Sequence, residues 1–168
     1  MKKIGNTVTV GSGGASSIDF DLTGVTGYTD LLIKLSCRTD STGAPAVYMK
    51  LNGVTTNMST RGLEGAGSGT PTSGTGTTPS IGVSNTGSQT ASVFSSIEVY
   101  IPNYTSSSQK FISDDSVREN NATSGIDFLS AGLWTGTSAI NTITLRVYGG
   151  SANLVQYSTF YLYGINNS

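Results

Sequence analysis

The sequence contains no histidine and has one cysteine, Cys37, in 168 residues. Without histidine the chain cannot build a serine–histidine triad, a cysteine–histidine dyad or most of the zinc and iron sites found in proteins. One cysteine cannot form an intrachain disulfide, and Cys37 falls in phase with the apolar residues of its segment, which indicates a small buried side chain. We therefore expect a protein that is not an enzyme, holds no cofactor or metal, and acts through its surfaces.

Charge is also scarce. Charged residues make up 11% of the chain, and 9 basic residues against 10 acidic ones give a net charge of -1. Nucleic acids and anionic membrane surfaces are bound by clustered basic residues, so this balance argues against both as partners. No apolar run approaches the roughly 20 residues of a membrane-spanning helix. Ser, Thr, Gly and Asn supply most of the polarity. This composition is typical of virion proteins, surface-layer proteins and carbohydrate-binding modules alike, so it does not separate these classes.

The acidic residues offer one weak cluster, formed by Asp114, Asp115, Glu119 and Asn120. Adjacent residues of a strand point to opposite faces, so Asp114 and Asp115 are not placed to act as a catalytic pair. The spacing also matches no calcium-binding loop. We interpret these groups as solvated turn carboxylates, with a calcium site and a two-carboxylate hydrolase as the alternatives.

Period-two alternation of apolar and polar residues, broken by turn residues, predicts an all-β protein of eight or nine strands. The expected strands are residues 7–10, 17–22, 30–38, 46–52, 92–101, 110–117, 127–134, 140–148 and 156–163. This count favours an antiparallel jelly-roll-like β-sandwich. An immunoglobulin-like sandwich is the alternative, although its paired cysteines are absent.

The segments between these strands complete the expected organisation. Asn52-Gly53 predicts a type I′ turn. Residues 62–87, rich in Gly, Ser and Thr, predict a long loop, with a possible short strand at 81–83, and residues 116–122 could form one helical turn. Residues 15–168 then form one β-sandwich domain, and residues 1–14 form an N-terminal arm.

Several tyrosines fall on the polar phase of their strands: Tyr48, Tyr100, Tyr148, Tyr161 and Tyr163. An exposed tyrosine can stack on a sugar ring or anchor a protein interface, where it gives contact area and a hydroxyl group at low entropic cost. A third interpretation is that this phase faces a second sheet, which would place the tyrosines at the edge of the core. Trp134 lies in an apolar strand and is expected in the core.

Seven stretches of the chain share the pattern of one group of proteins: 14–20 (GASSIDF), 28–35 (YTDLLIKL), 61–65 (RGLEG), 97–104 (IEVYIPNY), 116–123 (SVRENNAT), 132–134 (GLW) and 155–165 (VQYSTFYLYGI). Through these stretches the chain resembles small β-rich structural proteins of tailed bacteriophage virions. Similar domains occur as capsid cement, or decoration, proteins and as the tips of tail fibres. A fibre tip usually follows a shaft or coiled coil, and only about 15 residues precede the first matched stretch, which favours the cement protein.

The resemblance implies a role in the virion. The expected function is a protein made in the host cytoplasm that forms a homotrimer, binds the major capsid protein on the capsid exterior and stabilises the shell. The alternative is a receptor-binding domain that recognises host surface glycans. The arm, the long loop and the exposed tyrosines supply the candidate partner-interface residues, which are Lys2, Lys3, Ile4, Arg61, Leu63, Glu64, Tyr100, Tyr148 and Tyr161.

Overall fold

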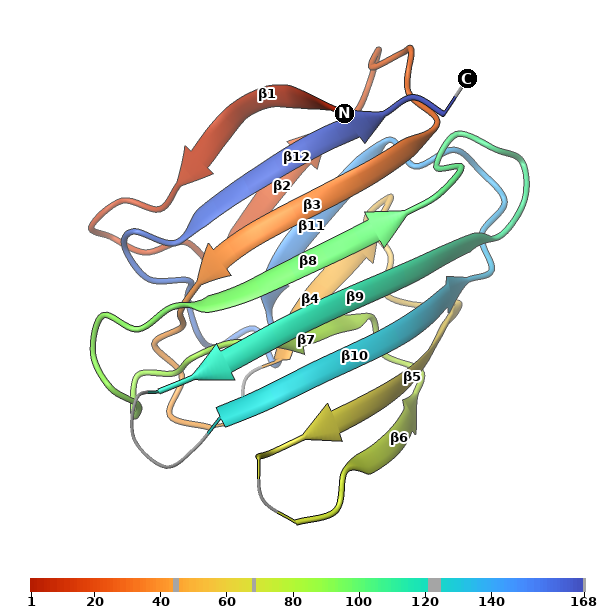
Figure 1. Cartoon of the computed structure of the whole chain (residues 1–168). Coiled ribbons are helices and arrows are strands. Elements are labelled where there is room, and N and C mark those ends of the chain that lie inside the picture. Colours follow the sequence, from red (N-terminus) through yellow and green to blue (C-terminus); the bar gives the residue numbers. More distant parts are fainter. Residues whose placement is uncertain (44–45, 68, 121–124, 168) are drawn as a thin grey trace.

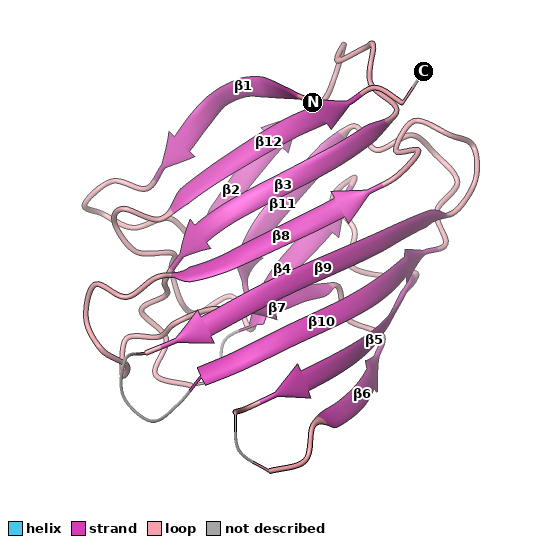
Figure 2. Cartoon of the chain, in the orientation of Figure 1, coloured by secondary structure: helices cyan, strands magenta, loops and turns pink. Residues whose placement is uncertain are grey.

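The structure is a computed structural model that describes residues 1–43, 46–67, 69–120 and 125–167. Every regular element in this part of the chain is a β-strand, so it holds no helix that could cross a membrane (Figure 2). The strands are β1 (Lys2–Thr9), β2 (Ser17–Asp21), β3 (Asp30–Cys37), β4 (Ala46–Leu51), β5 (Met58–Gly65), β6 (Thr72–Gly76), β7 (Ser80–Val83), β8 (Ser95–Ile101), β9 (Lys110–Glu119), β10 (Gly125–Trp134), β11 (Thr142–Val147) and β12 (Thr159–Ile165).

The strands form two antiparallel sheets of unequal width (Figure 1). The larger sheet has eight strands in the order β1-β12-β3-β8-β9-β10-β5-β6, and the smaller has four in the order β2-β11-β4-β7. The smaller sheet packs behind one half of the larger sheet, and its edge strand β7 reaches across β8, β9 and β10. The predicted all-β sandwich is confirmed. We refer to β9, β10, β5 and β6, which continue the larger sheet beyond β8, as the extension.

The hydrophobic core lies between the two sheets, where alternate residues of facing strands are completely buried. Ile33 and Val99 of the larger sheet and Met49 and Leu145 of the smaller sheet have no exposed surface. Cys37 is buried among them, as its phase predicted, and burial raises the pKa of its thiol to about 12. The thiol therefore stays protonated at neutral pH and serves as packing.

The expected long loop at residues 62–87 is wrong, because β5 ends within this segment and β6 follows it. The short strand expected at residues 81–83 is confirmed as β7. Glycine, serine and threonine give β6 no apolar face, so its sequence carries no alternation. The strand forms because its backbone pairs in unbroken register with β5, from Thr60 opposite Gly76 to Glu64 opposite Thr72. Pairing with a neighbour, rather than local propensity, determines the structure here.

Three other local predictions need comment. The expected arm of residues 1–14 instead holds β1, an edge strand paired with β12. No helical turn begins at Ser116, because β9 continues to Glu119; residues 121 and 122 lie outside the described residues. The Asn52-Gly53 turn is present: both residues have positive φ, and Leu51 and Val54 exchange backbone hydrogen bonds of 3.3 and 3.1 Å across it.

Two cations are buried where loops meet the sheets. The ammonium group of Lys110 donates to the carbonyl oxygens of Ser106 (2.7 Å), Ser108 (2.6 Å) and Ser138 (2.9 Å), and lies 5.6 Å from the ring centroid of Trp134. It therefore ties the β8–β9 loop to the β10–β11 loop. The same burial lowers the pKa of Lys110.

Arg38 has an equivalent role at the start of β8. Its guanidinium group donates to the carbonyl oxygens of Thr90 (2.6 Å), Val93 (3.3 Å) and Gln89 (2.8 Å). These bonds hold the loop between β7 and β8, which has few apolar side chains of its own.

We predict that Lys110→Met lowers the free energy of unfolding by about 2–4 kcal/mol, since it removes the buried charged donor of three hydrogen bonds to loop carbonyl oxygens. Lys34→Met is the matched control, because Lys34 makes an exposed 2.6 Å ion pair with Glu98 on the same sheet. That pair should contribute less than about 1 kcal/mol. Urea unfolding of both variants measures the difference, and equal losses would contradict the role assigned to Lys110.

Candidate functional site

The extension presents two faces with different chemistry, because side chains alternate across its strands. The pairing of β8, β9, β10, β5 and β6 is regular, so residues on neighbouring strands line up in transverse rows. Odd-numbered residues of β9, such as Asp115, point away from the smaller sheet, and even-numbered ones, such as Asp114, point toward it. We call these the outer face and the inner face.

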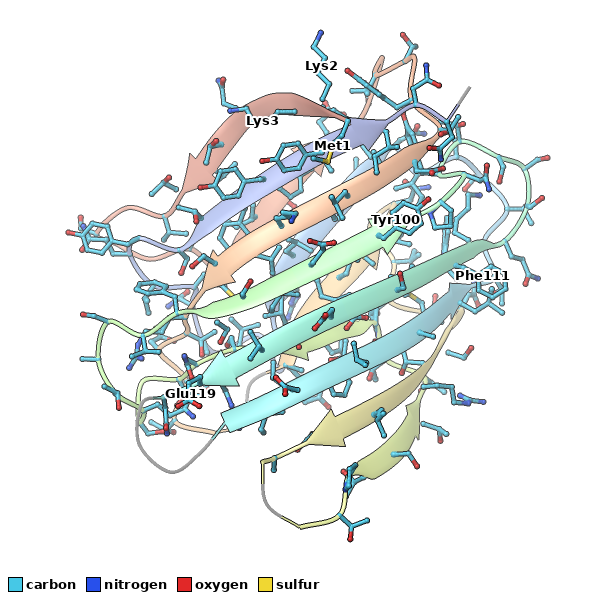
Figure 3. All side chains as sticks on the ribbon, in the orientation of Figure 1. Met1, Lys2, Lys3, Tyr100, Phe111 and Glu119 are labelled. Atoms are coloured by element: carbon cyan, nitrogen blue, oxygen red, sulfur yellow. The ribbon has the colours of Figure 1, made fainter. Side chains whose placement is uncertain are left out.

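The outer face carries four exposed apolar side chains, which we call the apolar strip. Their exposed fractions are 65% for Phe111, 52% for Leu129, 49% for Leu63 and 41% for Val117. Leu63 lies directly opposite Leu129, and Phe111 lies opposite the half-buried Leu133. Phe111 stands at the beginning of β9 in Figure 3. No described residue of the chain covers this strip.

Five of the nine predicted interface residues lie on this outer face, in two adjacent rows. Lys3, Tyr100 and Arg61 belong to one row, and Tyr161 and Leu63 belong to the next. Lys3 is on the edge strand β1, six strands away from Arg61, which corresponds to roughly 29 Å. The residues therefore share a broad face rather than one compact patch.

The other four predicted residues lie elsewhere. Ile4 packs against the core, and Glu64 is on the inner face of β5. Lys2 is exposed at the beginning of β1. Tyr148 is exposed just after β11 in the smaller sheet, and its ring lies 5.0 Å from that of Tyr48.

Tyr100 has a structural role that its sequence position did not indicate. Its hydroxyl donates to the buried carboxylate of Asp30 at 2.5 Å, and the same carboxylate accepts from the backbone N–H of Asn103 at 2.9 Å and from the side chain of Asn167. Burial raises the pKa of Asp30, but these hydrogen bonds outweigh it and hold the pKa below its usual value. Tyr100 thus joins β8 to the beginning of β3 and to the C-terminal segment.

The inner face of the extension contains a groove of about 260 Å³ beyond the edge of β7. Short polar side chains and glycines make up most of its wall. The lining residues are Thr60, Gly62, Glu64, Thr72, Ser73, Gly74, Thr75, Gly76, Ser80, Phe128 and Ser130. Gly62, Gly74 and Gly76 leave the floor without side chains, and this is the reason a hollow exists.

Phe128 is the one aromatic residue in the groove wall. A Cβ atom on Gly62 would come within 2.7 Å of its ring, so the ring lies directly over that glycine. Gly62 therefore has to lack a side chain for the ring to lie across the floor. Alternating glycines at 62, 74 and 76 were a usable signal in the sequence, but only the β5–β6 pairing shows that they share a face.

Asp114 lies beside the groove and is buried, so its interpretation as a solvated turn carboxylate is wrong. The hydroxyl of Ser130 donates to one of its oxygens, and the other oxygen has no hydrogen-bond partner among the described residues. Burial, with a smaller contribution from the charge of Asp115, raises the pKa of Asp114 to about 6, although the Ser130 hydrogen bond lowers it. Asp115 points to the outer face, as the alternation predicted, and no group of three or more potential metal ligands occurs in the described part of the chain.

We predict that stability falls as the pH rises through the pKa of Asp114. The Asp114 carboxyl binds its proton more tightly in the folded state than in the unfolded state, where its pKa is near 3.8. The stabilisation that protonated Asp114 gives below about pH 4 is therefore lost by about pH 7. A pKa raised by about two units corresponds to roughly 3 kcal/mol. Asp114→Asn should reduce the dependence of the free energy of unfolding on pH, and Asp115→Asn should leave it unchanged. Urea unfolding at several pH values measures both, and an unchanged slope in Asp114→Asn would contradict the assignment.

The chain was also compared with known proteins. No protein-family model, no curated protein and no solved structure matches it. The site therefore has to be interpreted from its own geometry.

Proposed function

We propose that this chain is a structural protein without catalytic activity that docks on a protein surface through the outer face of its larger sheet. The resemblance to virion proteins suggests the surface: the exterior of a bacteriophage capsid, formed by the major capsid protein. In this proposal the chain is a decoration protein that strengthens the shell. The observation that carries the docking role is the uncovered apolar strip on the outer face.

The size of the outer face supports docking. Eight strands at about 4.8 Å spacing span roughly 34 Å, and strands of about seven residues are roughly 23 Å long. The resulting face of about 800 Å² is the area that each partner contributes to a standard protein interface. Its apolar side chains are surrounded by polar and charged ones such as Arg61 and Asp115, as in the core and rim of an interface.

The strand order supports the finer designation of the fold as a jelly roll. Without the extension, the larger sheet has the order β1-β12-β3-β8 and faces β2-β11-β4-β7. Successive strands of these eight change sheet at every step except from β4 to β7, as they do in two nested Greek keys. The hairpins β5–β6 and β9–β10 are then insertions into this framework, and they supply the apolar strip.

We predict that Leu129→Lys weakens binding to capsids lacking the protein at least tenfold, or about 1.4 kcal/mol, because it places a charge in the centre of the apolar strip. The new lysine lies opposite Asp115, so the fold should tolerate it. Val54→Lys is the matched control, since Val54 is 40% exposed at the turn after β4. Capsid co-sedimentation measures the binding. Equal binding by the two variants would count against the outer face.

We also predict that purified particles carry many copies of the chain on the shell, and that the isolated protein forms a homotrimer. Cryo-electron microscopy of the particle and sedimentation analysis of the protein measure these two properties. A few copies confined to the tail would overturn the capsid role. A monomer that persists at high concentration would overturn the trimer.

A further inference from the structure

We propose that the groove on the inner face of the extension is a binding site for a neutral sugar unit, with Phe128 as its stacking surface and Ser130 and Thr60 among its hydrogen-bonding groups. The site is on the opposite side of the sheet from the apolar strip, because inner and outer residues alternate along β5 and β10. The inference therefore does not rest on the docking proposal.

The chemistry of the groove matches that of a pyranose. A sugar ring has an apolar C–H face and a rim of hydroxyl groups, so it needs one flat apolar surface and several small groups that both donate and accept hydrogen bonds. Phe128 supplies the surface, and its ring lies across the glycine floor. Hydroxyl side chains from β5, β6, β7 and β10 supply the polar groups: Thr60, Thr72, Ser80 and Ser130.

Asp114 determines the direction in which the Ser130 hydroxyl donates its hydrogen bond. The hydroxyl hydrogen of Ser130 is directed to the buried carboxylate, so the lone pairs of its oxygen remain to accept a hydrogen bond from a ligand. The second carboxylate oxygen of Asp114 is buried without a partner among the described residues. A buried acceptor of this kind is costly to the fold, which is typical of a position held for binding.

Charge and size narrow the ligand class further. Glu64 in the groove wall and Asp114 beneath Ser130 disfavour an anionic ligand. Arg118, on the same face, is buried, and this burial lowers the pKa of Arg118 although the negative charge of Glu64 opposes the lowering. A hollow of about 260 Å³ is small for a drug-sized ligand, and it suits one sugar unit, free or at the end of a chain.

The test uses the whole chain and three neutral probes, D-glucose, D-galactose and N-acetyl-D-glucosamine, with D-glucuronate as the anionic comparison. Each is titrated into ¹⁵N-labelled protein, and the amide signals of Gly62, Gly74 and Gly76 report on the groove. We expect saturable shifts at these glycines for at least one neutral sugar. The dissociation constant should be about 1 mM, as expected for a ligand of this size.

Two glycine variants make the test specific. A Cβ atom at Gly74 or at Gly65 would meet nothing within 4 Å, so Gly74→Leu and Gly65→Leu should both fold. Gly74→Leu fills the groove and should abolish the shifts, whereas Gly65 does not line the groove and Gly65→Leu should bind as the unmodified chain does. Phe128→Ala should weaken binding at least tenfold.

Several results would overturn the site. One is the absence of amide shifts with all three neutral sugars at concentrations 100-fold above the expected dissociation constant. The others are binding of glucuronate as tight as that of glucose, and sugar binding that persists in Gly74→Leu. Loss of capsid binding with intact sugar binding would leave this inference standing, since the docking role depends on the other face.

Discussion

The pairing of β9 with β8 is the constraint on which both proposed binding surfaces depend. Without it the larger sheet would end at β8 and match the four strands of the smaller sheet. With it, four more strands continue the sheet past the point where β7 can cover them. The register from Ser96 opposite Val117 to Tyr100 opposite Ser113 sets which residues of the extension face outward. A shift by one residue would place Leu129 and Phe111 inside and Asp114 in solvent.

The unequal width of the sheets explains why one sheet can carry an apolar surface and a polar hollow. In the covered half, large side chains such as Ile33 and Leu145 fill the space between the sheets. Beyond β7 there is no opposing sheet, so large apolar residues on the inner face would be exposed. The chain has Gly62, Gly74 and Gly76 there instead. The Val83 N–H donates to the hydroxyl of Ser116 at 3.2 Å and so joins β7 to β9.

The sequence predicted β9, β10 and most strands of the covered half, and it missed β5 and β6, for a physical reason. Strands such as β3 and β11 bury one face, so their alternation is visible in residues such as Ile33 and Ile143. β6 buries neither face and is held by backbone hydrogen bonds to β5. Such bonds leave no side-chain pattern in the sequence from which the strand could be predicted. The same limit applies to the site. Leu63 and Arg61 were candidates from the sequence and stay a prediction, but Phe128 and Ser130 become recognisable only when the register places them beside three glycines of other strands.

Alternation along β5 and β10 has a final consequence for how the two surfaces act together. Gly62 and Ser130 face the groove while their chain neighbours Leu63 and Leu129 belong to the apolar strip, so the two sites are separated by the thickness of a single sheet. A partner that covers the outer face leaves the groove pointing away from it, toward solvent. The docked chain would then present its sugar site outward, at the surface of whatever particle carries it.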